Sequence, residues 1–154
     1  MSPSPLKLEH AFDLFVEVAA PIEVGETALG SRRVISITGC RATGPKLKGS
    51  ILNAGADFQL IHTDGLTKLE ARYVIETDDG ARVYVDNVGL RYGAPEALEK
   101  LRRGEPVDPS LIYFRCAPRF ETGTASLRWL THNLFVGTGA RHPGHVEIAV
   151  WQVL

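Results

Sequence analysis

The sequence predicts an all-β fold, either a sandwich or a barrel, and two observations lead to this prediction. Residues 56–91 read as three consecutive strands joined by tight turns at Asp64-Gly65 and Asp79-Gly80, which makes an antiparallel meander. Asp-Gly between alternating runs is a strong hairpin signal, because glycine accepts the positive φ that such turns need. Further short runs of branched and aromatic residues bring the total to about nine strands, with the turn spacing typical of sandwiches and barrels.

The first strand is expected after a Ser/Pro-rich stretch at residues 1–5, which should be a disordered lead-in. Residues 6–20 fit either a helix or a strand, but the alternation of Leu14, Val16 and Val18 favours a strand in the second half. The remaining strands are expected at residues 29–39, 47–52, 56–62, 66–76, 82–91, 111–117, 133–137 and 145–154.

One short helix is expected at residues 95–104, between two groups of strands. Pro95 stands in its first turn, acidic Glu96 follows near the positive end of the helix dipole, and Gly104 closes it after basic residues. A single helical turn is expected at residues 125–130. The residues expected to form turns or loops, or to end a strand, are Gly44-Pro45, Pro118, Phe120–Gly123 and Thr138–Gly144.

Length and composition fit one domain spanning residues 1–154 and argue against several classes of function. The chain is 44% hydrophobic and 23% charged, an ordinary balance for a globular protein that can bury a core without disulfides. A net charge of -1 with dispersed basic residues argues against a nucleic-acid or anionic-membrane partner. No run approaches the roughly 20 apolar residues of a membrane helix. Because no secretory signal precedes Cys40 and Cys116, we expect a cytoplasmic protein with two reduced thiols; a disulfide between them is the alternative.

Cofactor and metal motifs are absent from the sequence. There is no glycine-rich phosphate loop, no HExxH, no GxSxG and no CxxC pair, so we expect no cofactor. His142 and His145 have a spacing that can bind a metal. Without a third partner, however, we favour solvated loop histidines over a metal site and expect no metal.

The informative residues are charged and phenolic side chains embedded in the expected strands. In a sheet with one face in water, alternating charges such as Lys68, Glu70 and Arg72 belong to the solvent side, which is the simplest interpretation. It fits Arg115 less well, because the neighbours of this residue are apolar or aromatic and a buried guanidinium needs an anionic partner. A barrel wide enough for a ligand would gather polar groups inside. The candidates for such a lining are Asp57, Glu70, Tyr84, Arg91, Tyr113, Arg115 and Asn133.

Three stretches of the chain resemble an uncharacterised bacterial and fungal family, the domain of unknown function 3237 (uncharacterised protein family 0311). They are GSILNAGADFQLIHTDGLTKLEARYVIETDDGARVYVDNVGLR, YFRCAPRFETG and LFVGTGAR. The resemblance implies a single antiparallel β-barrel of about eight to ten strands with one or two short helices, and it implies no activity. Asn53 and Phe58 depart from the family pattern, which could alter a pocket rim. The matching positions are Gly55, Asp57, Thr77–Gly80, Tyr84, Gly89, Arg91, Tyr113, Arg115, Pro118, Phe120, Glu121 and Asn133–Gly137.

Three hypotheses about function remain open at this point. In the first, the barrel binds a small, partly apolar organic molecule and acts on it without a cofactor, as an isomerase, cyclase, lyase or hydrolase. Asp57 or Glu70 would be the general acid or base, and the arginines, tyrosines and Asn133 would bind the substrate. In the second, the same cavity binds a ligand without chemistry. In the third, the polar residues serve only ion pairs or a homo-oligomer interface.

We favour the first hypothesis, because the candidate residues mix acids, bases and phenols, whereas a carrier of an apolar ligand needs fewer ionisable groups. A single bulge would exchange the inward and outward faces of a strand, so both faces supply candidates.

Overall fold

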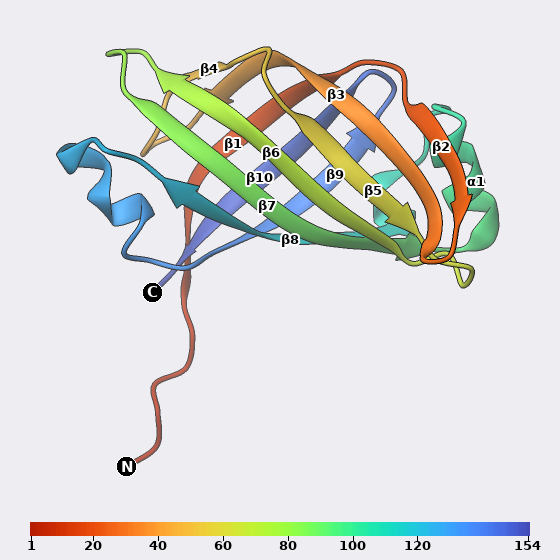
Figure 1. The fold of residues 1–154 in the computed structure, drawn as a ribbon. Coiled ribbons are helices and arrows are strands. Elements are labelled where there is room, and N and C mark those ends of the chain that lie inside the picture. Colours follow the sequence, from red (N-terminus) through yellow and green to blue (C-terminus); the bar gives the residue numbers. More distant parts are fainter.

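The computed structural model covers residues 1–154 and is built almost entirely of antiparallel strands (Figure 1). The strands are β1 (Leu8–Val18), β2 (Ile22–Thr27), β3 (Gly30–Thr43), β4 (Gly49–Ile51), β5 (Ala56–Ile61), β6 (Thr67–Thr77), β7 (Arg82–Gly93), β8 (Ile112–Glu121), β9 (Phe135–His142) and β10 (His145–Val153). The helical segments are α1 (Pro95–Arg102) and the short 3-10 helices η1 (Pro109–Leu111) and η2 (Ala125–Leu130).

The sheet closes into a barrel because β1 pairs with β10 on one side and with β3 on the other. From β1 the order runs through β10, β9, β8, β7 and β6. β4 and β5 share the next position, since each pairs with both β6 and β3 at a different level of the barrel. β2 lies at the edge and pairs only with β3. The predicted all-β, antiparallel barrel is therefore confirmed, as a closed eight-stranded barrel with two extra strands.

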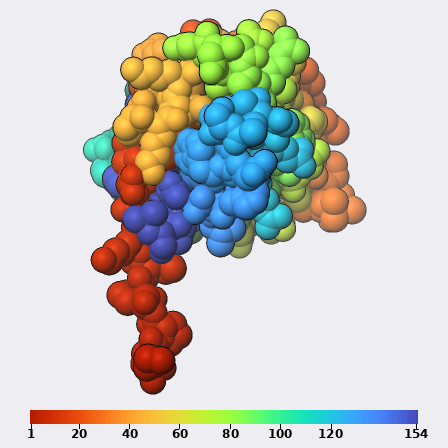
Figure 2. All heavy atoms as spheres, turned by 90° about the vertical axis from the view of Figure 1, so that its left-hand side faces the viewer, coloured from red at the N-terminus to blue at the C-terminus, as the bar shows by residue number.

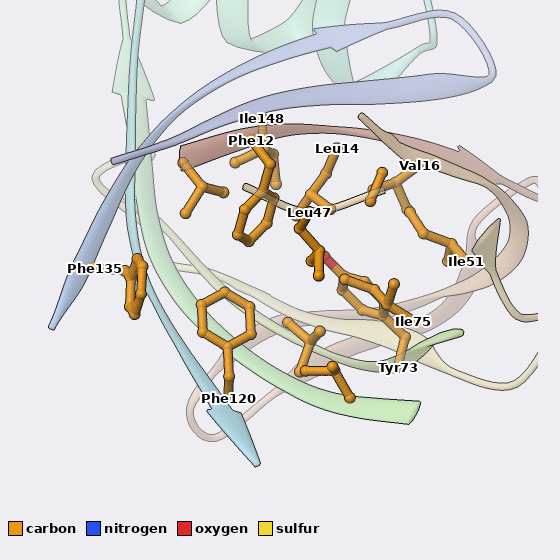
Figure 3. Close-up of a cluster of buried hydrophobic side chains, with 14 of the residues drawn as sticks. Phe12, Leu14, Val16, Leu47, Ile51, Tyr73, Ile75, Phe120, Phe135 and Ile148 are labelled. Carbon is orange, nitrogen blue, oxygen red and sulfur yellow. The ribbon is translucent and has the colours of Figure 1, made fainter. Parts of the chain in front are cut away.

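The hydrophobic core fills the end of the barrel opposite α1. Inward-facing residues of most strands form one cluster of 18 buried side chains, part of which Figure 3 shows. Phe120 makes edge-on contacts with Phe12 and Phe135, with ring centroids 5.7 and 5.2 Å apart. η2 closes this end, because its Leu130 is fully buried and Trp129 packs against the cluster. In Figure 2 the segment between β8 and β9, coloured blue, covers this end of the molecule.

α1 covers the other end of the barrel (Figure 1), and its presence confirms the short helix predicted at residues 95–104. Ala97 and Leu101 are its buried residues, and Gly104 follows with a φ of 78°, a backbone conformation that glycine adopts without strain. The stretch before β1 extends away from the barrel in both whole-molecule views (Figures 1 and 2). Neither α1 nor any other helix has the length and apolar character needed to cross a bilayer.

Several element boundaries differ from the sequence prediction. Residues 8–18 form one continuous strand, β1, although only the second half of residues 6–20 was expected to be a strand, and β2 was not expected. β8 does not end at Pro118, but on the β9 side it is unpaired there, which agrees with the alternative that Pro118 marks an edge. Proline has no backbone N–H to donate. Because β8 pairs with β9 only at Arg115 and Cys116, Pro118 removes no hydrogen bond between these two strands, and the strand tolerates it. The expected turn at residues 120–123 begins inside β8, and most of the expected loop at residues 138–144 is the second half of β9.

Candidate functional site

A cavity lies in the half of the barrel that the core leaves unfilled, towards the end covered by α1. The space free of protein atoms is about 550 Å³, part of it open to solvent, and the volume that the centre of a water-sized sphere can occupy is about 40 Å³. Of its 17 lining residues, 11 are hydrophobic, so a ligand here would meet a mainly apolar wall. The side chains with polar atoms come from five strands: Asp57 and Gln59 of β5, Tyr73 of β6, Asn87 and Arg91 of β7, Cys116 of β8 and Arg141 of β9. We call this space the lumen.

Asp57 is the only carboxylate that lines the lumen, and both of its oxygens accept hydrogen bonds. Gln59 Nε2 donates to Oδ2 at 2.9 Å, and the backbone amide of Glu70 donates to Oδ1 at 3.1 Å. Burial nevertheless raises the pKa of Asp57, because loss of water penalises the charged form more than these bonds and the charge of Arg91 favour it. Asp57 is therefore a carboxyl group set to exchange a proton at a higher pH than an ordinary aspartate does.

Arg91 is the second charged group of the lumen and is only 6% exposed. Its guanidinium lies 5.8 Å from the ring centroid of Phe114, and its Nε has no hydrogen-bond partner. Burial lowers the pKa of Arg91 to about 10; the Asp57 carboxylate opposes this effect, while Arg141 and Arg33 add to it. Arg91 is still a cation at neutral pH, and it has a free donor.

Two further arginines surround the charged part of the lumen. Arg141 reaches it from the end of β9, where its Nη1 donates to the backbone oxygens of His142 and His145 at 3.0 and 3.4 Å. Arg33 of β3 lies towards α1 and pairs with Glu23, with Nε and Oε1 3.3 Å apart. Burial lowers the pKa of both groups. The charged region thus holds more cationic than anionic side chains.

The remaining polar atoms of the lumen are mostly without partners. The amide oxygens of Gln59 and Asn87 and the hydroxyl of Tyr73 are buried and make no hydrogen bond. Burial raises the pKa of Tyr73 and raises that of Cys116 to about 11, so at neutral pH one is a phenol and the other a thiol. The lumen therefore offers acceptors, one phenolic donor and a cation, with Asp57 as the group that can change its protonation.

The structure brings together only Asp57 and Arg91 of the seven candidates predicted from the sequence. Tyr84 lies on the outer side of β7, because the alternating residues Val83 and Val85 are the fully buried ones. Glu70 also faces outwards: its side chain is 46% exposed and lies 3.6 Å from an exposed arginine, and only its backbone amide contacts Asp57.

The candidates on β8 and beyond are also placed elsewhere. Tyr113 is 42% exposed and stacks on Tyr92 with ring centroids 4.7 Å apart. The guanidinium of Arg115 lies over the Tyr113 ring on the same outer face, at 5.2 Å. Asn133 caps the closed end of the barrel, where its Nδ2 donates to the Trp129 oxygen at 2.9 Å. Tyr113 and Arg115 therefore do not line the lumen with Asp57, because the inward positions of β8 are Phe114 and Cys116, and Asn133 lies at the other end of the barrel.

Five lumen residues with polar atoms were not among the candidates predicted from the sequence, namely Gln59, Tyr73, Asn87, Cys116 and Arg141. Gln59 could have been found, since it stands two residues after Asp57 in a strand and so shares its face. Tyr73 follows Leu69 on the apolar face of β6 and carries the only polar atom near the middle of that face. Arg141 had no signal, because its segment was expected to be a loop.

The sequence matches one protein family and several proteins of similar length. The family model described as "Protein of unknown function (DUF3237)" matches residues 6–153. An uncharacterised protein of Rhodopseudomonas palustris is 49% identical over 154 residues, which is 100% of both chains. A protein of Clostridium acetobutylicum is 34% identical over 149 residues, covering 96% of this chain and 94% of that one.

Solved structures show the same fold. The crystal structure of the Rhodopseudomonas palustris protein covers 99% of this chain and 100% of its own, with a TM-score of 0.95. A β-barrel-like protein of Acinetobacter baumannii is 38% identical, covers 99% of both chains and has a TM-score of 0.88. A more distant structure, described as an enzyme from Penicillium herquei, is 20% identical with a TM-score of 0.73 over 100% of this chain and 98% of that one, a likeness of fold alone.

Proposed function

The chain belongs to the DUF3237 family of proteins of unknown function, and from that premise we propose that its lumen binds a small, partly apolar organic molecule and transfers protons on it without a cofactor. The reaction class is that of an isomerase, cyclase, lyase or hydrolase. Asp57 is the general acid or base, and Arg91 holds the carboxylate or enolate oxygen that carries negative charge during the reaction.

One observation carries this proposal: four buried polar atoms of the lumen residues have no partner within the protein. They are Gln59 Oε1, Tyr73 Oη, Asn87 Oδ1 and Arg91 Nε. An unpaired buried polar group costs about 1–3 kcal/mol, and native proteins contain few of them. Several in one cavity are explained if a bound molecule, or water in its absence, supplies the missing hydrogen bonds. The hydrophobic lining favours a molecule with an apolar body.

The charges of the lumen support acid–base chemistry in particular. The raised pKa of Asp57 keeps this carboxyl protonated to a higher pH than an ordinary aspartate, which suits a group that must gain and lose a proton during catalysis. Arg91 stays charged and has a free Nε, so it can stabilise an oxyanion in a site that excludes most water. Cys116 is a poor nucleophile here, because its pKa of about 11 leaves little thiolate at neutral pH.

The experiment that tests the proposal separates binding from chemistry. Small aromatic and branched aliphatic keto acids, each paired with its neutral ester, are screened by thermal shift and then incubated in D2O. NMR follows deuterium uptake at the carbon next to the carbonyl. Asp57→Asn should lower this exchange by about 10²–10⁴-fold, whereas Glu70→Gln, which changes a carboxylate on the outer face, should not. Equal exchange by the wild type and Asp57→Asn rules out Asp57 as the proton-transfer group.

A binding protein without chemistry is the alternative use of the same lumen. It is favoured by the prevalence of hydrophobic lining residues, since a carrier needs mainly an apolar enclosure. In that case Arg91→Met weakens binding of the acids but not of their esters, and no ligand is converted by any variant. A cytoplasmic location remains part of the proposal, and the two free cysteines fit a reducing compartment.

A homo-oligomer is a further proposal, and one surface feature supports it. The outer face of β7 exposes Val88, Leu90 and Tyr92 in a row, and Tyr113 of β8 extends it. Adjacent exposed apolar side chains are characteristic of interaction surfaces. Light scattering on the eluting peak tests the assembly, and Leu90→Glu should convert an oligomer to a monomer. If the wild-type protein elutes as a monomer at all concentrations, the homo-oligomer is excluded.

A further inference from the structure

We propose that the β9–β10 turn binds a divalent transition-metal ion, with His142, His145 and Glu147 as its ligands. The chemical class expected is an ion that accepts imidazole and carboxylate together, such as Zn²⁺. The site is on the outer surface of the barrel and is separate from the lumen. Binding of the metal does not depend on the ligand proposed for the lumen.

The geometry of the turn supplies three ligands on one face. His142 and His145 are opposite each other across the hairpin, and Glu147 follows His145 by two residues, which places it on the same face of β10. Glu147 is five residues away from His142 in the sequence, and the two side chains come close only because β9 and β10 pair.

The distances are close to those of a metal site. Glu147 Oε2 lies 3.7 Å from His142 Nε2, and Glu147 Oε1 lies 3.4 Å from His145 Nε2. Ligand atoms of the three residues all lie within 4.8 Å of one another. A tetrahedral zinc ion with bonds of about 2.0–2.2 Å holds its donors roughly 3.4 Å apart, so small side-chain rotations would complete the site.

The two imidazoles lie side by side at the turn. Their rings stack with centroids 4.7 Å apart and an interplanar angle of 16°. Glu17 of β1 pairs with His145 across the neighbouring strand and faces the same side. Its carboxylate or a water molecule would fill the fourth position.

The proposed site is connected to the lumen through Arg141. Nη1 of this arginine donates to the backbone oxygens of His142 and His145, the same two residues whose side chains would hold the metal. A metal bound to the side chains of His142 and His145 on the outer surface would therefore hold their backbone carbonyl groups in place. These carbonyl groups position the Arg141 side chain in the lumen. In this arrangement the metal ligands act as positioning residues for a lumen cation, much as outer groups orient the ligands of other sites.

The test is a zinc titration of the full-length protein after treatment with a chelator and buffer exchange. Calorimetry should show one equivalent of Zn²⁺ bound, and His142→Asn, His145→Asn and Glu147→Gln should each weaken binding at least tenfold. His132→Asn is the matched control, because this exposed histidine lies at the opposite end of the barrel and should leave the affinity unchanged. At a free Zn²⁺ concentration of about 100 Kd the Tm should rise by about 5–10 °C.

The link to Arg141 has its own readout. In ¹⁵N-labelled protein, Zn²⁺ should shift and sharpen the side-chain signal of Arg141 and leave that of Arg119, an exposed residue of β8, unchanged. The proposal is overturned by absence of stoichiometric binding, or by binding that survives in a variant carrying both His142→Asn and Glu147→Gln. Stoichiometric binding with no change at Arg141 overturns the positioning role.

Discussion

Replacing Tyr73 by phenylalanine removes one oxygen atom from the barrel interior, and we expect it to stabilise the ligand-free protein. Tyr73 is 1% exposed and its hydroxyl has no partner in the protein. An unpaired buried polar group costs about 1–3 kcal/mol, and phenylalanine keeps the packing of the ring. Because a water molecule in the lumen can recover part of this cost, the expected gain in the free energy of unfolding is about 1 kcal/mol.

Urea denaturation followed by tryptophan fluorescence measures this gain, and a gain of that size should also raise the Tm by about 2–4 °C. Tyr84→Phe is the matched control, because it makes the same chemical change on the outer face of the neighbouring strand and should stay within about 0.5 kcal/mol of the wild type. A loss of about 1 kcal/mol or more in Tyr73→Phe alone refutes the reasoning, since the hydroxyl would then make a net stabilising bond.

Three further predictions follow from the same interior. As the pH rises above about 4, the free energy of unfolding of the wild type should fall relative to that of Asp57→Asn, by at most about 1.4 kcal/mol per pH unit, until the pH passes the raised pKa of Asp57, because ionising this carboxyl costs more in the folded protein than in the unfolded chain. Urea titrations at each pH measure the difference, and a difference that does not change with pH would contradict the prediction. Gly139→Ala should lose about 1–3 kcal/mol in urea denaturation, because its Cβ would lie 2.6 Å from a phenylalanine ring, whereas Gly123→Ala, with open space around it, should not. A thiol reagent at neutral pH should label half-buried Cys40 well before Cys116, whose pKa is about 11, and mass spectrometry of the labelled peptides showing the reverse order would refute the assignment.

The antiparallel strands were predictable because hairpin signals are local, whereas strand patterns left a sandwich or a barrel open and only the family resemblance implied the barrel. The site was partly predictable, because it depends on which face of each strand points inwards. Tyr84 and Arg91 are an odd number of residues apart, and β7 pairs with β6 and β8 without a register break. Only one of them can therefore face the lumen. Val83 and Val85 continue the face of Arg91, so the alternation already in the sequence favoured Arg91. The same rule moves Arg115 outwards, because Phe114 and Cys116 occupy the inward positions beside it.

Arg141 was out of reach of sequence reasoning for a different reason. Its approach along β9 passes Gly137 and Gly139, which read locally as loop residues. The structure shows that they are small because side chains of β8 pack against their backbone: an added Cβ would lie 2.7 Å from Cys116 Sγ at Gly137 and 2.6 Å from the Phe114 ring at Gly139. These glycines are positions in a strand where side chains of the neighbouring strand pack against the backbone. Such contacts become visible only when segments that are distant in the sequence pair.

The barrel has one half filled by the core and one half that contains the lumen, and this division explains how unpaired polar atoms persist in so small a protein. The filled half buries a continuous cluster of 18 side chains and supplies the stability of the fold. The half that contains the lumen keeps Asp57 and Arg91 within mainly apolar walls, although apolar residues of similar size would fill that space at lower cost in desolvation. Tyr73 lies where the halves meet, since it belongs to the cluster and also lines the lumen. Stability alone would favour phenylalanine at this position, so the unpaired hydroxyl of Tyr73 supports the proposal that the lumen binds a ligand.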